Sequence, residues 1–121
     1  MGLGWSTEVL CNKIILMKHR IFISLFLSPA KEYIDGLLPS DQGTIAANIE
    51  VMREGDFESV NTKQLKGQVR ELIVGNHRLT YFGISNILYF VRGFRKKSRK
   101  TPLKEIEYAE KIYKATKEIK K

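Results

Sequence analysis

Three short β-forming runs, joined by two-residue links, constrain the fold of this chain more than any other feature of its sequence. The runs cover residues 69–74, 77–84 and 87–94, and the links are Gly75-Asn76 and Ser85-Asn86. A link of two residues joins antiparallel neighbours, because a parallel connection needs a crossover of about a dozen residues or more. We therefore predict a three-stranded antiparallel meander.

The sequence before the meander predicts one strand followed by two short helices. Residues 21–27 mix β-branched and aromatic side chains without a helical stripe, which favours a strand. Ser28-Pro29 is expected to begin a helix with the serine as its N-cap, and Pro39 is expected to end it. Asp41 is expected to cap the second helix and Gly55 to terminate it. These two helices predict a hairpin laid over a sheet.

Two further segments complete the predicted domain. Residues 56–67 are polar and irregular, which predicts a surface loop. Thr101-Pro102 opens a last helix, whose apolar residues between positions 103 and 119 cover about half of its circumference. This arc is wider than packing on one small sheet needs, so core packing and a partner surface both stay open for it. The elements together predict an α+β domain, a small twisted antiparallel sheet with a two-helix hairpin and a C-terminal helix.

Length and composition exclude several classes of protein. The 121 residues are enough for one hydrophobic core, and we divide them into an N-terminal extension, residues 1–19, and a domain, residues 20–121. The apolar stretch at residues 14–27 is broken by three basic residues into halves too short to span a bilayer. The single cysteine, Cys11, forms no internal disulfide, and no zinc-binding spacing occurs. We expect a cytoplasmic protein that uses no metal or cofactor and binds no membrane.

The whole formal net charge of +8 lies near the C-terminus. Residues 1–91 hold nine Lys or Arg and nine Asp or Glu, whereas residues 92–121 hold twelve basic and four acidic residues. A basic edge on an otherwise neutral body attracts a polyanion, of which nucleic acid is the commonest. We interpret the edge as a phosphate-binding site, with a solvated basic tail as the alternative. Five of its cations directly follow the last β run: Arg95, Lys96, Lys97, Arg99 and Lys100.

Several motifs of the sequence resemble those of one toxin superfamily. In chain order they are Leu65-Lys66-Gly67, Arg70-Glu71-Leu72, Arg78-Leu79-Thr80-Tyr81-Phe82, and Phe94-x-Lys96-Lys97-x-x-Lys100-Thr101-Pro102 with Glu105 and Ala109 after it. The last motif is the most specific. With the predicted order of elements, these residues resemble the RelE/ParE toxin superfamily, and within it the HigB-like, phage-derived branch, over roughly residues 20–115.

The resemblance implies a RelE-like fold and a toxin of a type II toxin–antitoxin pair. Such a toxin cleaves mRNA in the decoding site of the ribosome, and a cognate antitoxin, here expected to be a helix-turn-helix protein, neutralises it. The residues that we expect to act in catalysis are Arg78, Lys96, Lys97 and Lys66. The residues that we expect to bind RNA are Arg70, Arg95, Arg99, Lys100, Phe94 and Tyr81.

The chemistry of RNA cleavage agrees with these residue types. RNA carries its own nucleophile, the 2′-hydroxyl, so cleavage without a metal needs cations that stabilise the charge gained by the phosphate, and groups that move protons. We expect Arg78 and either Arg95 or Lys97 to reach one phosphate from adjacent strands, with Lys66 approaching from the preceding loop. The proton-transfer group stays open among the clustered lysines, Tyr81 and His77.

Some of these side chains also have ordinary structural interpretations. Packing is favoured for Tyr81, a turn position for His77, a surface ion pair for Glu71 and a core position for Phe94. Two other functions stay open, namely a ParE-like, non-nucleolytic inhibitor of a protein target and a non-catalytic RNA-binding module. Cations from two neighbouring strands around one phosphate favour the nuclease, because an inhibitor of the gyrase type has no need of them.

Overall fold

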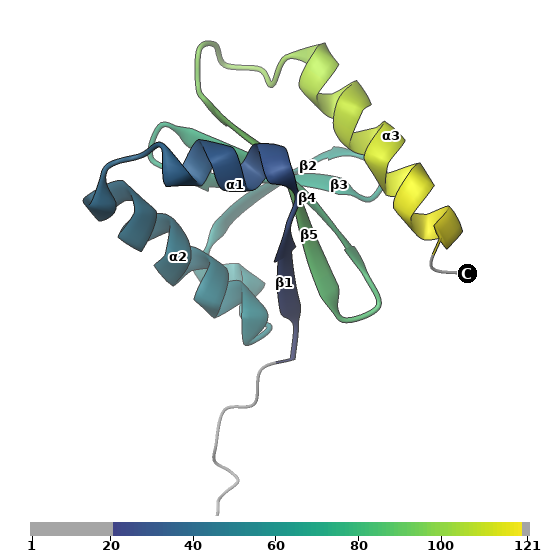
Figure 1. Ribbon diagram of the computed structural model, residues 1–121, viewed down its shortest axis with the longest axis horizontal. Coiled ribbons are helices and arrows are strands. Elements are labelled where there is room, and N and C mark those ends of the chain that lie inside the picture. The colour runs from purple at the N-terminus through teal and green to yellow at the C-terminus, as the bar shows by residue number, and fades with distance from the viewer. Residues whose placement is uncertain (1–20, 120–121) are drawn as a thin grey trace, which may run out of the picture.

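The computed structural model describes residues 21–119, which form one five-stranded sheet with helices on both faces (Figure 1). Its strand order is β1-β5-β4-β3-β2, with β1 parallel to β5 and every other neighbouring pair antiparallel. The predicted fold class is confirmed, whereas the N-terminal extension lies outside the described residues and stays a prediction. The strands are β1 (Ile23–Phe26), β2 (Asn61–Lys66), β3 (Val69–Val74), β4 (His77–Ile84) and β5 (Ile87–Arg95).

The predicted meander is confirmed, since β3, β4 and β5 occupy the three predicted runs and keep the two predicted links. At the first link Gly75 has a φ of +60°, a left-handed conformation that glycine adopts without the steric cost of a Cβ. The antiparallel pairing of β4 with β5 is interrupted by a bulge, where the register shifts between Thr80 and Tyr81. A bulge places one extra residue in one strand and reverses which face the following side chains point to.

The prediction of a surface loop at residues 56–67 is wrong. This segment instead forms a short 3-10 helix, η1 (Phe57–Ser59), and the strand β2, which pairs antiparallel with β3. The strand lies at the edge of the sheet, and its sequence, Asn-Thr-Lys-Gln-Leu-Lys, is mostly polar and exposed. Charged edge strands resist pairing with other chains, and such a strand shows little of the apolar alternation by which strands are predicted.

The helical hairpin is confirmed, but its helices begin differently from the prediction. The helices are α1 (Ser28–Asp35) and α2 (Pro39–Arg53), and their N-caps are Leu27 and Leu38, without a side-chain hydrogen bond. Each helix has its proline in the first turn. The proline ring fixes φ there, and its missing N–H is not needed, because the N–H groups of the first turn have no partner within the helix. Pro39 therefore begins α2 and does not end α1, and Asp41 lies in the first turn.

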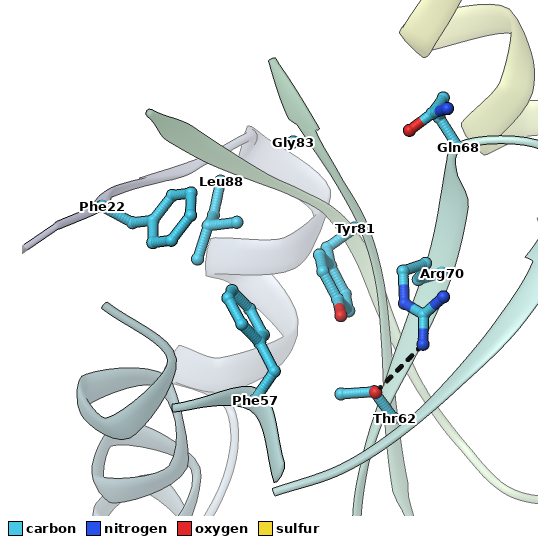
Figure 2. Close-up of a pocket in the computed structure, with 8 residues that line it drawn as sticks. All are labelled: Phe22, Phe57, Thr62, Gln68, Arg70, Tyr81, Gly83 and Leu88. Atoms are coloured by element: carbon cyan, nitrogen blue, oxygen red, sulfur yellow. Dashed lines mark hydrogen bonds between the residues drawn. The ribbon is translucent and has the colours of Figure 1, made fainter. Parts of the chain in front are cut away.

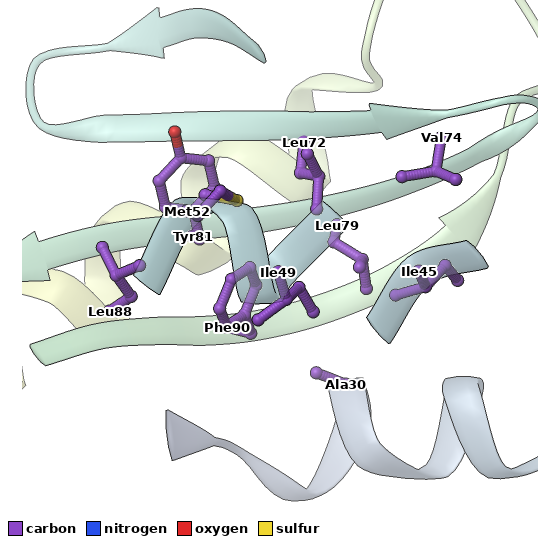
Figure 3. Close-up of a cluster of buried hydrophobic side chains, with 10 residues drawn as sticks. All are labelled: Ala30, Ile45, Ile49, Met52, Leu72, Val74, Leu79, Tyr81, Leu88 and Phe90. Carbon is purple, nitrogen blue, oxygen red and sulfur yellow. The ribbon is translucent and has the colours of Figure 1, made fainter. Parts of the chain in front are cut away.

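The hairpin packs on one face of the sheet, which we call the hairpin face. Figure 3 shows the buried cluster there, in which Ile45, Ile49 and Met52 of α2 pack against side chains of β3, β4 and β5. Two aromatic rings pack within this cluster, and the ring centroids of Tyr81 and Phe90 lie 5.5 Å apart. The cluster as a whole consists of Ala30, Ile45, Ile49, Met52, Leu72, Val74, Leu79, Tyr81, Leu88 and Phe90.

The C-terminal helix α3 (Leu103–Ile119) packs on the other face, which we call the α3 face. Its fully buried Ala109 lies against Val69, Phe82 and Val91 of the sheet, with other side chains of the predicted apolar arc around it. The ends of the arc are not covered, because Leu103 is 67% and Ile119 is 83% exposed. Core packing therefore accounts for the middle of the arc, and its two ends face solvent in the described chain.

Candidate functional site

The turn that follows β5 folds back against the α3 face at one end of the sheet. Residues 96–102, which we call the basic turn, line a small pocket together with Glu71 of β3, Arg78 of β4 and Phe94 of β5. The backbone N–H of Lys96 donates to the carbonyl oxygen of Asn76 over 2.7 Å and fixes the start of the turn. The space inside, which we call the basic pocket, is only about 20 Å³.

A buried carboxylate ties the basic turn to the sheet. Glu71 is 2% exposed, and its Oε1 accepts a hydrogen bond of 2.6 Å from the hydroxyl of Thr101. Its other oxygen, Oε2, lies 4.0 Å from Nε of Arg78. A buried charge is stable only when it is paired and hydrogen-bonded, and both conditions are met here. The predicted surface ion pair of Glu71 is therefore wrong, because both partners lie inside the basic pocket.

Arg78 lies at the bottom of the basic pocket. Its side chain is 12% exposed, and its Nη1 donates to the carbonyl oxygens of Gly75 at 2.8 Å and of His77 at 3.0 Å. Within residues 21–119 its Nη2 makes no hydrogen bond, so two of the five guanidinium donors remain for an external acceptor. The sheet thus holds this guanidinium in a fixed place and leaves the N–H donors of Nη2 free.

The remaining cations of the basic turn are exposed around this guanidinium. Among the described residues, no ion pair engages Lys96, Lys97, Arg99 or Lys100. Ser98, Arg99 and Lys100 border a wide concavity of about 910 Å³ at the outside of the turn. Four exposed, unpaired cations, two of which border this concavity, attract an anionic chain such as the polyphosphate backbone of RNA.

The structure does not bring all the predicted site residues together. In the strand register Arg78 is opposite Phe94, whereas Arg95 is opposite His77 and lies with it on the hairpin face. The bulge in β5 causes this separation, since an unshifted register would have placed Arg78 and Arg95 on the same face. Arg78 therefore shares its pocket with Lys96 and Lys97, and not with Arg95.

The other predicted residues occupy different places. Lys66 is at the end of edge strand β2, where its ammonium lies 3.2 Å from the Glu110 carboxylate of α3. Arg70 and Tyr81 line a pocket on the hairpin face, and Tyr81 packs in the core, as its favoured interpretation predicted. Phe94 is half-buried in the wall of the basic pocket and belongs to neither core cluster, so its favoured core interpretation is wrong.

A second polar cluster, which sequence reasoning missed, lies on the hairpin face. The hydroxyl of Tyr33 and Nδ1 of His77 are 2.6 Å apart, and Nε2 of His77 is 3.7 Å from the Asp41 carboxylate. His77 is the first residue of β4, pairs with Val74 and is 6% exposed, so its predicted position in the turn is wrong. Burial raises the pKa of Tyr33, nearby Arg95 acts in the opposite direction, and Asp41 adds to the rise. Residues 44 positions apart in sequence carry no local signal of such a contact.

This cluster supports the end of the sheet that carries Arg78. A Cβ on Gly93 would overlap the ring of Tyr33, so the glycine lets that ring lie directly on β5. The carbonyl oxygen of His77 in turn accepts a hydrogen bond from Nη1 of Arg78. The hydrogen bonds of Tyr33 and His77 therefore fix the backbone from which Arg78 projects to the other face.

The comparisons with known proteins agree with this fold. A family model described as phage-derived protein Gp49-like (DUF891) matches residues 32–114, more than half of the sequence. The chain belongs to the phage-derived Gp49-like family. The matched region of this family member spans α1 to α3 and includes the whole basic pocket. No curated protein matches the sequence.

Three solved structures share the fold of this Gp49-like chain at low sequence identity. The RelE–RelB complex of Pyrococcus horikoshii OT3 aligns with a TM-score of 0.56 and 9% identity, over 66% of this chain and 99% of the other. The RelB–RelE antitoxin–toxin complex of Methanococcus jannaschii gives 0.52 and 17%, over 59% and 88%. The intact Escherichia coli RelBE toxin–antitoxin complex gives 0.50 and 16%, over 64% and 99%. The predicted RelE-like fold is confirmed.

Residues 21–119 hold neither a membrane-spanning helix nor a cluster of metal-ligating side chains. In that part of the chain no helix combines the length and the apolar character needed to cross a bilayer. The same residues contain no cluster of three or more His, Cys, Asp or Glu side chains that could hold a metal ion. The polar groups that line the basic pocket are its cations, the carboxylate of Glu71 and the hydroxyls of Ser98 and Thr101.

Proposed function

We propose that this protein is the toxin of a type II toxin–antitoxin pair and that it cleaves mRNA at the basic pocket while the message is on the ribosome. One observation carries the proposal: a guanidinium with free donors lies at the bottom of a pocket rimmed by unpaired lysines and an arginine. The RelE-like fold supports it, because the three similar structures are all complexes of a toxin with its antitoxin. The activity would be that of a metal-independent endoribonuclease in the cytoplasm.

In the proposed reaction the 2′-hydroxyl of the RNA attacks the adjacent phosphate and the 5′-oxygen leaves. Nη2 of Arg78 and the ammonium groups of Lys96 and Lys97 stabilise the additional negative charge on the phosphate. In a serine protease, one preorganised hydrogen-bond donor to the oxyanion lowers the barrier by about 2.7–4 kcal/mol, and we expect an effect of this order here. Arg99 and Lys100 hold the flanking phosphates, and Phe94 offers a ring on which a base can stack.

The geometry narrows the choice of proton-transfer group. His77 and Tyr81 both face the hairpin side of the sheet, so neither reaches a phosphate in the basic pocket. Glu71 is occupied by Thr101 and lies behind Arg78. The lysines of the basic turn are the groups left to move protons in the proposed site.

A cognate antitoxin is the proposed partner besides mRNA and the ribosome. The concentration of net charge on one edge favours an acidic surface on that partner, and complementary charges speed association. The exposed ends of the α3 arc, Leu103 and Ile119, add apolar area beside this edge. We expect the antitoxin to be a helix-turn-helix protein whose gene lies next to that of the toxin.

Induced expression with matched variants tests the proposal. We expect the unaltered protein to arrest growth, and Arg78→Ala or Lys96→Ala to relieve the arrest, with cleavage slowed about 10²–10³-fold by the loss of one charged donor. Lys31→Ala is the matched control, because Lys31 is an exposed cation of α1 that pairs with Asp35. Full toxicity of a correctly folded Arg78→Ala protein would show that the basic pocket is not the active site.

Metal independence has a separate test. The purified protein should cleave a short message on programmed ribosomes in a buffer whose only divalent ion is the Mg²⁺ that ribosomes need. On isolated RNA, any cleavage should persist in excess EDTA. Strict dependence on a second added metal would contradict the proposed use of cations alone.

A further inference from the structure

One pocket on the hairpin face has no part in the proposed reaction. We call it the aromatic pocket, and its volume is about 330 Å³, at the lower end of the range of sites that hold small molecules. It lies on the sheet face opposite the basic pocket, beside η1 and the start of β1. Its lining residues are Phe22, Phe57, Thr62, Gln68, Arg70, Tyr81, Gly83 and Leu88.

The walls of the aromatic pocket are suited to a planar ring. Phe22 and Phe57 meet edge to face, with ring centroids 5.4 Å apart and an interplanar angle of 78°. Figure 2 shows Tyr81 between these phenylalanines on one side and Arg70 with Thr62 on the other. A ligand ring that enters among them gains both apolar burial and aromatic contacts.

Tyr81 adds a polar group to the aromatic pocket. The residue as a whole is 3% exposed, and within residues 21–119 its hydroxyl makes no hydrogen bond, but the hydroxyl oxygen is not among the fully buried atoms that lack a partner. A hydroxyl that reaches solvent bonds to water, and a ligand oxygen can replace that water. This hydroxyl lines the pocket, so a ligand oxygen can accept its proton in a hydrogen bond.

Arg70 sets the charge of the ligand. Its Nη2 donates to the Thr62 hydroxyl at 3.3 Å, and its other donors make no hydrogen bond within the described chain. It is the only charged residue among those that line the pocket. A guanidinium fork matches a carboxylate by two parallel hydrogen bonds, whereas a phosphomonoester brings up to two negative charges against this single cation.

The geometry points to a binding site for a small aryl carboxylate, with the ring between Phe57 and Tyr81 and the carboxylate on Arg70 and the Tyr81 hydroxyl. The occupant is a free small molecule, because a volume of about 330 Å³ suits one aryl ring with its carboxylate. The site is separate from the basic pocket, so its existence does not depend on whether the protein cleaves RNA.

Titration of the full chain with 3-phenylpropionate, followed by two-dimensional NMR, tests this site. We expect the backbone signal of Gly83 and the ring signals of Phe57 to shift, with a dissociation constant of about 1 mM or tighter for a ligand of this size. The neutral analogue 3-phenylpropionamide keeps the ring and should bind at least about tenfold more weakly, because charged hydrogen bonds are worth more than neutral ones.

Variants separate the two polar contacts. Arg70→Gln should abolish the preference for the acid over the amide, and Tyr81→Phe, which keeps the ring, should weaken acid binding by a few fold. Arg99→Gln removes the same charge on the other side of the sheet and should leave acid binding unchanged. If the Arg70→Gln protein fails to fold, the Tyr81→Phe variant and the comparison of acid with amide still test whether the pocket binds a carboxylate.

Four outcomes would overturn the inference. The first two are an absence of shifts at Gly83 and Phe57, and equal binding of the acid and the amide. Tighter binding of phenyl phosphate than of 3-phenylpropionate would contradict the carboxylate assignment. Tighter binding of a peptide that ends in phenylalanine than of the free acid would show that the occupant is a chain terminus and not a small molecule.

Discussion

Glu71 shows how single residues build the basic pocket. It is a carboxylate in the interior of a strongly basic region, where its charge is satisfied by Thr101 on one oxygen and approached by Arg78 on the other. The threonine of the Lys-Thr-Pro motif therefore has a structural role, since it ties the basic turn to β3. Arg78 keeps its free donors because backbone carbonyls and Glu71 hold the rest of its guanidinium.

Thr101→Val should weaken this tie. The substitution keeps the shape of the side chain but leaves Oε1 of Glu71 without its donor, and an unsatisfied buried acceptor costs about 1–3 kcal/mol. Urea unfolding should show a loss of stability of that size. The control is Ser98→Ala, because the Ser98 hydroxyl donates to Lys100 in an exposed part of the same turn. Equal losses for the two variants would contradict a special role for the Glu71 contact.

Tyr33 gives a prediction about pH. Burial raises its pKa above the ordinary value of 10.0, so the folded protein favours the neutral phenol more than the unfolded chain does. Its contribution to stability is complete below pH 10 and is lost as the pH rises through the higher folded value. The stability difference between the unaltered protein and Tyr33→Phe should thus shrink from pH 8 to pH 11 in urea unfolding. A constant difference would contradict the raised pKa.

The C-terminal helix shows how an element is held by a few close contacts. Glu105 and Ala109 are its buried residues, and they are the two that follow the Lys-Thr-Pro motif at fixed offsets. Glu105 lies 3.0 Å from Nε of Arg92, in contact but without hydrogen-bond alignment, while Ala109 touches the second core cluster. The small side chain of Ala109 allows α3 to approach the sheet.

Ala109→Leu should disturb this approach. Extra atoms in a packed contact cost about 1–3 kcal/mol, and alanine and leucine have similar helix propensities, so the loss would come from packing. The matched control is Ala115→Leu, on an exposed position of the same helix. Thermal unfolding should separate the two variants. Equal melting temperatures would show that α3 does not need a small residue at position 109.

The sequence predicted those elements whose signals are local. The runs of β3, β4 and β5 are separated by two-residue links, and Pro29 and Pro102 mark the starts of α1 and α3, so these positions follow from neighbouring residues. Strand β2 was missed because its pairing with β3 is made by the backbone, while its side chains are those of a loop. The N-caps were misplaced by one residue for α1 and by three for α2, because Ser28 and Asp41 lie inside the first turns of helices whose N-caps are Leu27 and Leu38.

The candidate site was predictable in composition but not in geometry. The five cations and the Lys-Thr-Pro motif are contiguous, and the structure groups most of them around Arg78. A single bulged residue in β5 places Arg95 on the hairpin face, away from Arg78, and no pattern in the sequence predicted this bulge. The contact of Tyr33 with His77 and the burial of Glu71 depend on tertiary packing over long sequence separations.

At the scale of the whole molecule, charge is distributed unevenly. The net charge of +8 belongs to the C-terminal quarter, and its exposed part lies on the basic turn and along α3. Binding of single-stranded RNA to such an edge releases counterions, so the logarithm of the binding constant falls linearly with the logarithm of salt concentration.

The slope of this dependence should report which cations touch RNA. Replacing Lys97, Arg99 and Lys100 together by glutamine should reduce the slope by about 2, at about 0.7 per phosphate contact on a single strand. Replacing Lys104, Lys111 and Lys114 of α3 removes the same charge and should change the slope much less. Fluorescence anisotropy with a short RNA at several salt concentrations measures both. Equal reductions would mean that the RNA lies along α3.

The measurement that tests the central claim most directly is a map of transcript 5′ ends after induced expression of the unaltered protein and of Arg78→Ala. We predict new ends inside translated reading frames with the unaltered protein, their loss when translation is blocked, and their absence with a folded Arg78→Ala. The same new ends with both proteins, or growth arrest by the unaltered protein without new ends, would contradict RNA cleavage at the basic pocket.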